Sequence, residues 1–312
     1  NTFIIPENSE LTSIGIGVFE NSPIESLFIP ANVNEIDKGW CSKMNDLTQI
    51  TLSPNNKNFI YIDNKMLIGK SKKNKDSDEY DLLLFARRDI KSIVIPSFVR
   101  IIGAYAFNSC KSLEKVKFSE SPQLIEIHKA AFRKTALESI SIPKSVQLID
   151  SRAFASCHNL HTVEIPPDSE CHTIGNTAFL KCPIEQISIP KSVLNIDSEA
   201  FYRCEKMTDV FFDEESQLTS ISMSAFSFSG IERISIPDSV RTISDFAFNE
   251  CNNLRKIEIS ENSQLISIGN EAFNQTQIGH LFIPSKTFCL SDNWCYDIPT
   301  LNDITISSEM NT

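Results

Sequence analysis

The sequence lacks the long apolar run and the excess of basic charge that several classes of protein need. No stretch approaches the roughly 18 apolar residues of a membrane-spanning helix. The opening residues, NTFIIPENSE, lack the basic, apolar and cleavage regions of a signal peptide. The net charge of −11 repels phosphate. We therefore expect no nucleic-acid partner and no direct membrane insertion by this segment.

Signatures of catalysis and metal binding are also missing. The sequence contains no G-x-G-x-x-G, P-loop, G-x-S-x-G or H-E-x-x-H motif. The histidines and cysteines between residues 156 and 172 do not have the C-x2-C and H-x3-5-H spacing of zinc ligands. We therefore predict a non-enzymatic protein with no catalytic residues, no cofactor and no metal site.

The sequence does contain a repeat. IPKSVQLIDSRAFASC begins at Ile142, and IPKSVLNIDSEAFYRC begins 47 residues later at Ile189, with related stretches at Ile95 and Ile236. The Phe of the AF pair, here called the anchor, recurs at spacings that alternate between 25 and 22 residues. The anchors are Phe107, Phe132, Phe154, Phe179, Phe201, Phe226, Phe248 and Phe273. Two unit types therefore alternate along the chain.

Each unit predicts one short strand. Its apolar residues follow the order of Leu137, Ile140 and Ile142, which is typical of a strand with one buried face, and a Pro usually ends the strand. A unit of 22 to 25 residues cannot bury such a face alone, whereas stacked units form a continuous core. We predict a single solenoid over residues 1–312, with about 13 strand units from Phe3–Ile5 to Ile304–Ile306.

The repeat pattern I-P-x-S-V-x-x-I-x-x-x-A-F-x-x-C-x-x-L resembles the BspA-like leucine-rich repeats. It alternates with S-Q-L units such as FDEESQLTSISMSAF (212–226), which resemble surface proteins of protist parasites and mucosal bacteria. Repeat length and resemblance predict an α/β-type solenoid with a right-handed superhelix. A parallel sheet would line its concave face, and mostly short turns or 3-10 segments its convex face.

One insertion interrupts the repeat. Between Leu52 and Phe85, two apolar stretches flank a polar, charged segment, which predicts a hairpin-like insertion at about 55–84. It is either a tolerated loop between turns or a projecting element that binds a partner.

Nine cysteines leave an odd count. Several occupy the slot three residues after an anchor, where Thr135, Ser229 and Thr276 stand in other units. Cysteines two turns apart cannot bridge, although Cys182 could conceivably pair with Cys157 or Cys204. Because the slot requires a small side chain, we expect buried free thiols at Cys110, Cys157, Cys182, Cys204 and Cys251.

The candidate binding residues lie on the outward face of the predicted strands. Most middle strand positions are small or polar, but Phe28, Phe211 and Phe282 are aromatic, and an exposed aromatic ring can anchor a partner. Phe211 has Asp209, Arg233 and Ser235 as predicted neighbours. These six residues form the predicted ligand-binding set.

The family resemblance implies an adhesin or surface antigen, because some members bind extracellular-matrix proteins or host cells. We predict a cell-surface or secreted recognition protein that binds such a protein through the concave sheet and its flanking loops. The alternative is a cytoplasmic protein–protein interaction scaffold. The missing signal peptide and the reduced thiols favour that alternative.

Overall fold

The computed structural model describes residues 1–74 and 77–307. The chain forms two compact units, Asn1–Glu138 (unit 1) and Ser139–Thr312 (unit 2). Among the described residues, the sole helical element is the single 3-10 turn η1 (Lys72–Asn74), which lies in the insertion. The α/β assignment and the 3-10 segments predicted for the convex face are therefore not supported. Parallel strands and turns build the solenoid instead.

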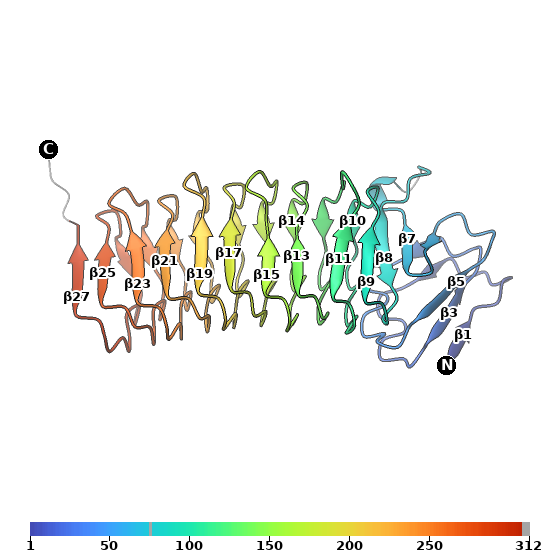
Figure 1. Ribbon diagram of the computed structural model, residues 1–312, viewed down its shortest axis with the longest axis horizontal. Helices are drawn as coiled ribbons and strands as arrows, with labels where there is room; N and C mark the ends of the chain where they lie inside the picture. Colours follow the sequence, from blue (N-terminus) through green and yellow to red (C-terminus); the bar gives the residue numbers. More distant parts are fainter. Residues whose placement is uncertain (75–76, 308–312) are drawn as a thin grey trace. The chain divides into compact units, whose positions relative to one another are not determined.

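The described strands of unit 2 belong to three sheets and pair in parallel (Figure 1). The sheet with the longer strands, here called the front sheet, contains β13 (Ser139–Ser141), β15 (Thr162–Glu164), β17 (Gln186–Ile189), β19 (Asp209–Phe212), β21 (Arg233–Ile236) and β23 (Lys256–Ile259). Next in the chain, β25 (His280–Ile283) pairs with β27 (Asp303–Ile306). The second sheet, here called the back sheet, has two-residue strands: β14 (Leu148–Ile149), β16 (Thr173–Ile174), β18 (Asn195–Ile196), β20 (Ser220–Ile221), β22 (Thr242–Ile243), β24 (Ser267–Ile268) and β26 (Cys289–Leu290).

Each turn of the solenoid has three segments: a front strand, a back strand and a segment that carries the anchor. The backbone of the anchor segment is regular but is neither a strand nor a helix. Thr177 and Lys181, two residues before and after Phe179, both have positive φ (53° and 59°). The backbone between these two residues is oriented so that the Phe179 N–H donates to the Ala200 carbonyl of the next turn at 2.8 Å. The same ladder recurs at Phe154, Phe201, Phe226 and Phe248. These hydrogen bonds offset the cost of left-handed backbone at residues other than glycine.

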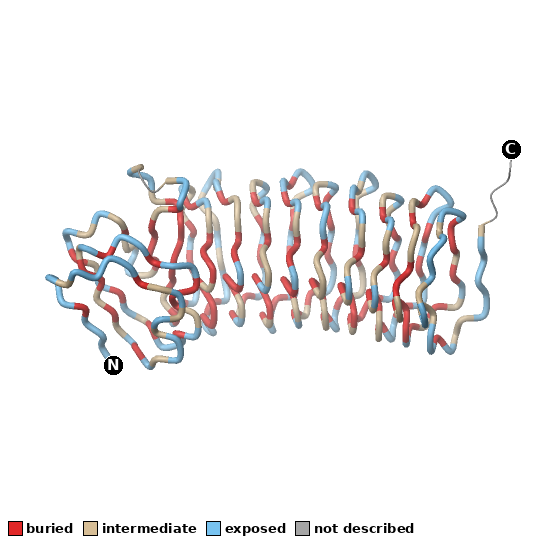
Figure 2. Tube along the Cα trace, turned by 180° about the vertical axis from the view of Figure 1, so that it is seen from behind, coloured by how far each residue is buried: buried red, intermediate tan, exposed pale blue. Residues whose placement is uncertain are grey.

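The anchor rings form the centre of the core. In unit 2, six fully buried phenylalanines stack face to face, with neighbouring ring centroids 5.3 to 5.8 Å apart and interplanar angles of 3° to 12°. They are Phe154, Phe179, Phe201, Phe226, Phe248 and Phe273. Because each turn places the same ring one strand spacing further along, the repeat produces one continuous apolar column. Figure 2 shows buried positions recurring from turn to turn along the backbone.

Unit 1 begins with three turns of the same kind. Its longer strands β1 (Thr2–Ile4), β3 (Ser26–Ile29) and β5 (Gln49–Leu52) pair in parallel, as do the short strands β2 (Ser13–Ile14) and β4 (Glu35–Ile36). After the insertion, β9 (Ser92–Ile95) pairs with β11 (Lys115–Phe118). The structure therefore has 13 strands at the predicted positions in its described part: β1, β3, β5, β9, β11, β13, β15, β17, β19, β21, β23, β25 and β27.

The insertion adds antiparallel strands to the short-strand sheet of unit 1. β6 (Ile60–Ile62) and β7 (Met66–Gly69) form a hairpin, and β7 also pairs antiparallel with β8 (Leu82–Ala86). β8 then runs parallel to β10 (Ile101–Ile102), which pairs with β12 (Glu126–Ile127). Because β7 is buried along its whole length, this part of the insertion is packed within the unit. Residues 75 and 76 of the insertion lie outside the described residues, and the single domain over 1–312 stays a prediction.

Candidate functional site

Four of the six candidate residues meet on the outward face of β19 and β21. The parallel register pairs Asp209 with Arg233 and Val210 with Ile234. Val210 and Ile234 are buried, and side chains alternate between the two faces of a strand. Asp209, Phe211, Arg233 and Ser235 therefore lie on the opposite, outward face, and these four residues are called the β19–β21 patch below.

An ion pair crosses this patch. Arg233 Nε donates to Asp209 Oδ1 at 3.1 Å, and Thr208 Oγ1 donates to Asp209 Oδ2 at 2.9 Å. The Asp209 side chain is 15% exposed, whereas that of Arg233 is 72% exposed. The carboxylate is thus held from two sides. The terminal nitrogens of Arg233 make no hydrogen bond with a described residue, so they are available to a partner.

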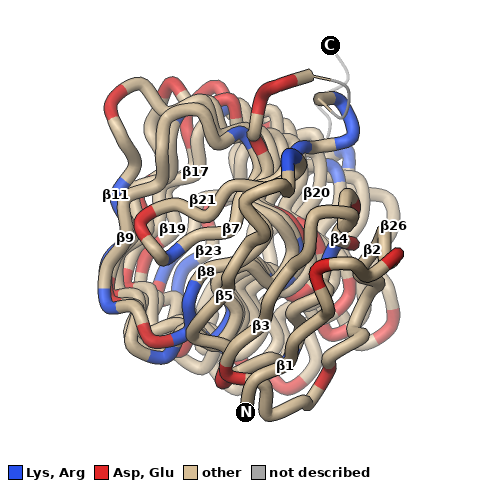
Figure 3. The backbone as a smooth tube through the Cα atoms, turned by 90° about the vertical axis from the view of Figure 1, so that its right-hand side faces the viewer, with Lys and Arg blue, Asp and Glu red and all other residues tan. Residues whose placement is uncertain are grey.

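Phe211 is the apolar part of the patch. Its ring is 48% exposed, and the parallel register places it opposite Ser188 of β17. Ser188 and Ser235 are small and exposed, so neither can cover the ring. On the next strand, β23, Lys256 forms an ion pair with Glu258, so charges of both signs continue along this face. Figure 3 marks the basic and acidic positions along the backbone. An exposed ring beside charges of both signs suits contact with a protein surface.

The remaining two candidates lie elsewhere. Phe282 is partly buried on β25, opposite Thr305 of β27, outside the front sheet. Phe28 is partly buried on β3 of unit 1. The repeat pattern places both in equivalent strand positions, but it does not bring them into the β19–β21 patch.

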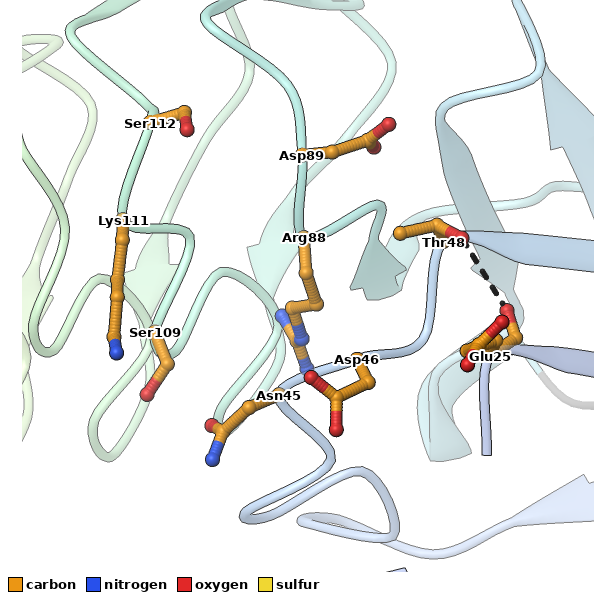
Figure 4. Close-up of a pocket in the computed structure, with 9 residues that line it drawn as sticks. All are labelled: Glu25, Asn45, Asp46, Thr48, Arg88, Asp89, Ser109, Lys111 and Ser112. Carbon is orange, nitrogen blue, oxygen red and sulfur yellow. Dashed lines mark hydrogen bonds between the residues drawn. The ribbon is translucent and has the colours of Figure 1, made fainter. Parts of the chain in front are cut away.

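Unit 1 has a polar pocket of about 530 Å³ (Figure 4). Its lining residues are Glu25, Asn45, Asp46, Thr48, Arg88, Asp89, Ser109, Lys111 and Ser112. Arg88 is only 5% exposed, and its guanidinium lies 4.7 Å from the centre of the Phe85 ring. A buried cation in a pocket could hold an anion, so its hydrogen bonds decide its role.

The Arg88 guanidinium is occupied by backbone carbonyls. Nε donates to Met44 O at 3.0 Å and Nη1 to Ala106 O at 2.7 Å, and Nη2 lies 3.4 Å from both Cys41 O and Tyr105 O. These carbonyls belong to the turns before and after the insertion, which Arg88 thereby ties together. We conclude that Arg88 is a structural clamp rather than an anion-binding residue.

The sequence interpretation missed Arg88, although a signal was present. Phe85 lies 22 residues before the anchor Phe107, and Arg88 stands three residues after it, where the eight anchors are followed by Cys, Ser or Thr. A long charged side chain at a slot for small buried residues indicates that the local backbone differs from the repeat. Here β8 replaces the usual anchor turn, and the Arg88 guanidinium donates to Met44 O and Ala106 O of the turns before and after the insertion.

The slot cysteines are buried thiols, and no disulfide joins Cys182 to Cys157 or Cys204. The side chain in the slot also donates a hydrogen bond to a backbone carbonyl. Cys182 Sγ donates to Phe154 O at 3.0 Å, and Cys204 Sγ donates to Phe179 O at 3.2 Å. Burial raises the pKa of the Cys204 and Cys251 thiols to about 12. Such thiols remain protonated at neutral pH and are poor nucleophiles.

Neither a metal centre nor a membrane span is found in the part of the chain that the structure describes. No group of three or more His, Cys, Asp or Glu side chains there is placed to hold a metal ion. None of the described helices is long and apolar enough to cross a bilayer.

Comparison with known proteins places this geometry in a family. A family model described as BspA type leucine rich repeat region matches residues 1–74, 83–208 and 219–312, in six copies. A leucine-rich repeat protein from Eubacterium ventriosum has a similar structure, with a TM-score of 0.54 and 21% identity over 100% of this chain and 67% of that chain. The pneumococcal vaccine antigen PcpA gives a TM-score of 0.51 and 19% identity over 99% of this chain and 73% of that chain. At these identities the likeness concerns the fold. A comparison with curated proteins found no match.

Proposed function

Because the chain belongs to the BspA-type leucine-rich repeat proteins, we propose that it is a non-enzymatic recognition protein. Its protein partner binds the outward face of the front sheet in unit 2. The β19–β21 patch is the centre of that contact, with Phe211 as the apolar anchor and Arg233 as the charged one.

The exposed ring of Phe211 on a paired strand is the observation that supports this proposal most. β19 is hydrogen-bonded to β17 and to β21, and the Asp209–Arg233 ion pair crosses the same two strands as the patch. A side chain on such a scaffold loses little conformational freedom when a partner binds. Few residues carry most of the energy of an interface, and Arg is enriched among them.

The same proposal places the protein at a cell surface or outside the cell, with a host or extracellular-matrix protein as partner. Support comes from the family and from the fold shared with PcpA, a pneumococcal vaccine antigen. The alternative, a cytoplasmic interaction scaffold, is favoured by the free and exposed thiol of Cys289, since exposed thiols are unusual in oxidising compartments.

Two measurements test these proposals. Surface plasmon resonance of the purified chain over immobilised matrix proteins should give saturable binding to at least one of them, and no binding to any would contradict the matrix partner. Treating intact source cells with a membrane-impermeant label should modify the chain. Protection of the chain together with an intracellular control protein would instead support the scaffold.

A further inference from the structure

A second cavity of unit 1, of about 670 Å³, lies beside the insertion. Its apolar lining comes from the insertion and from the short-strand sheet: Ile36, Phe59, Leu82, Leu84 and Ile101. A repeat without the insertion offers no such space, because its neighbouring turns stack directly on one another. The volume falls within the range of sites that hold small molecules.

Three lysines of the insertion line the same cavity. Lys70, Lys72 and Lys73 form no ion pair with a described residue, and the Lys70 ammonium lies 5.3 Å from the centre of the Tyr80 ring. Their loop is held by the carboxylate of Asp81, which is 4% exposed. Asp81 accepts hydrogen bonds from the Ser71 backbone N–H (2.7 Å), the Ser71 hydroxyl (2.8 Å) and the Asn74 amide (2.8 Å). The backbone that carries the lysines is therefore fixed before any ligand arrives.

A buried histidine on the lining has an unused hydrogen-bonding atom. His128 is 6% exposed, and its Nε2 bonds to the Glu126 carboxylate at 2.5 Å. Its Nδ1 is buried and has no partner in the described part of the chain. Because this nitrogen has almost no accessible surface, a ligand in the cavity does not reach it, and His128 contributes only the outer part of its ring to the lining.

The cavity also has acidic residues on another segment. Glu35 and Asp37 line it from β4 and the residue after that strand, and they are exposed. Neither forms an ion pair with a lysine of the insertion within the described residues. Lys38, next to Asp37 in sequence, and Glu126 also line the cavity, so its lining carries charges of both signs and the insertion contributes lysines only.

We propose that this cavity binds a small amphipathic anion, in which a carboxylate faces Lys70, Lys72 and Lys73 and an apolar body covers the floor. The site is separate from the β19–β21 patch and adds a small-molecule ligand to the proposed recognition of proteins. Three lysines on one short loop, none of them in an ion pair with a described residue, carry the charge argument in a chain whose net charge is −11.

Calorimetric titration of the full chain with octanoate, and with the neutral alcohol 1-octanol, tests the charge requirement. We expect one octanoate site and an affinity about fivefold above that of the alcohol, since one partly exposed ion pair is worth about 1 kcal/mol. Raising the salt concentration should weaken octanoate binding and leave octanol binding unchanged. Equal affinities, or no saturable octanoate binding, would overturn the proposal.

Matched variants locate the site. Lys72→Gln with Lys73→Gln should weaken octanoate binding about fivefold, whereas Lys115→Gln with Lys117→Gln, an equal charge change on the exposed face of β11, should not. Glu35→Gln with Asp37→Asn should strengthen binding about twofold by removing like charges. An equal loss of octanoate affinity in both lysine variants, or weaker binding after removal of the acids, would show that the anion does not bind beside the lysines of the insertion.

Discussion

Arg233 Nε lies 3.1 Å from Asp209 Oδ1, on two strands whose parallel register pairs these residues. They are 24 residues apart in sequence, one turn of the solenoid. The repeat thus brings one charged residue from each turn into direct contact, beside the exposed Phe211 ring. Neighbouring turns can therefore build a surface that no single unit contains.

Replacing Arg233 should affect stability only slightly. Because its side chain is 72% exposed, we expect Arg233→Ala to lower the free energy of unfolding by about 1 kcal/mol or less. The difference should shrink at roughly 1 M salt, where the screening length falls to about 3 Å. Urea denaturation at low and high salt measures both effects. A loss of several kcal/mol that is insensitive to salt would mean that the pair is structural.

Phe211 and the anchor Phe201 provide a matched comparison. Phe201→Ala empties part of the buried ring column and should cost about 3 to 5 kcal/mol. Phe211→Ala removes a ring that is 48% exposed and should cost less than about 1 kcal/mol. Thermal denaturation of both variants checks this. A similar cost for the two would show that Phe211 is a packing residue and would weaken its assignment to the patch.

Arg88 should be essential for unit 1. Arg88→Met keeps a long side chain over Phe85 but removes the donor to Met44 O and one of the two donors to Ala106 O, so we expect a loss of about 1 to 3 kcal/mol. Arg88→Lys should rescue little, because one ammonium group cannot reach carbonyls on separate turns. Hydrogen exchange should show the loss of protection in residues 41–110. Full protection in Arg88→Met would refute the clamp.

The buried thiols predict loss of stability at alkaline pH. Burial raises the pKa of the Cys204 and Cys251 thiols from 9.0 to about 12 in the folded state. The contribution of these thiols to the free energy of unfolding is complete below pH 9 and is lost as the pH rises toward 12. In that interval only the unfolded chain releases the thiol protons. Between these pH values, each thiol should lower the free energy of unfolding by about 1.4 kcal/mol per pH unit.

Serine at both positions keeps a small donor and removes the titration. Cys204→Ser with Cys251→Ser should therefore flatten the stability–pH curve above pH 9. Cys289→Ser, at an exposed thiol, should leave the curve unchanged. Urea denaturation across the alkaline range provides the measurement. An unchanged slope in the double serine variant would contradict the assigned burial.

The sequence predicted the features that repeat and missed those that break the repeat. The spacing of the anchors was enough to locate the strands and the buried rings, because every turn of a solenoid repeats the same backbone conformation and packing. The anchor ladder was not predicted, since its left-handed positions hold residues such as Thr177 and Lys181 rather than glycine. The Arg88 clamp and the amphipathic cavity depend on contacts made by the insertion, which no repeat pattern describes. In the candidate site, the repeat spacing places Asp209 opposite Arg233. Phe28 on β3 and Phe282 on β25 occupy equivalent strand positions outside the front sheet.

The central claim is that a protein partner binds the β19–β21 patch. For the matrix protein that the chain binds most tightly, surface plasmon resonance should compare Phe211→Ala with Met223→Ala. Met223 is also exposed and apolar, at 46%, but lies outside the front-sheet strands. We predict that Phe211→Ala weakens binding about tenfold or more and that Met223→Ala leaves it unchanged. Unchanged affinity in Phe211→Ala, or an equal loss in Met223→Ala, would contradict the claim.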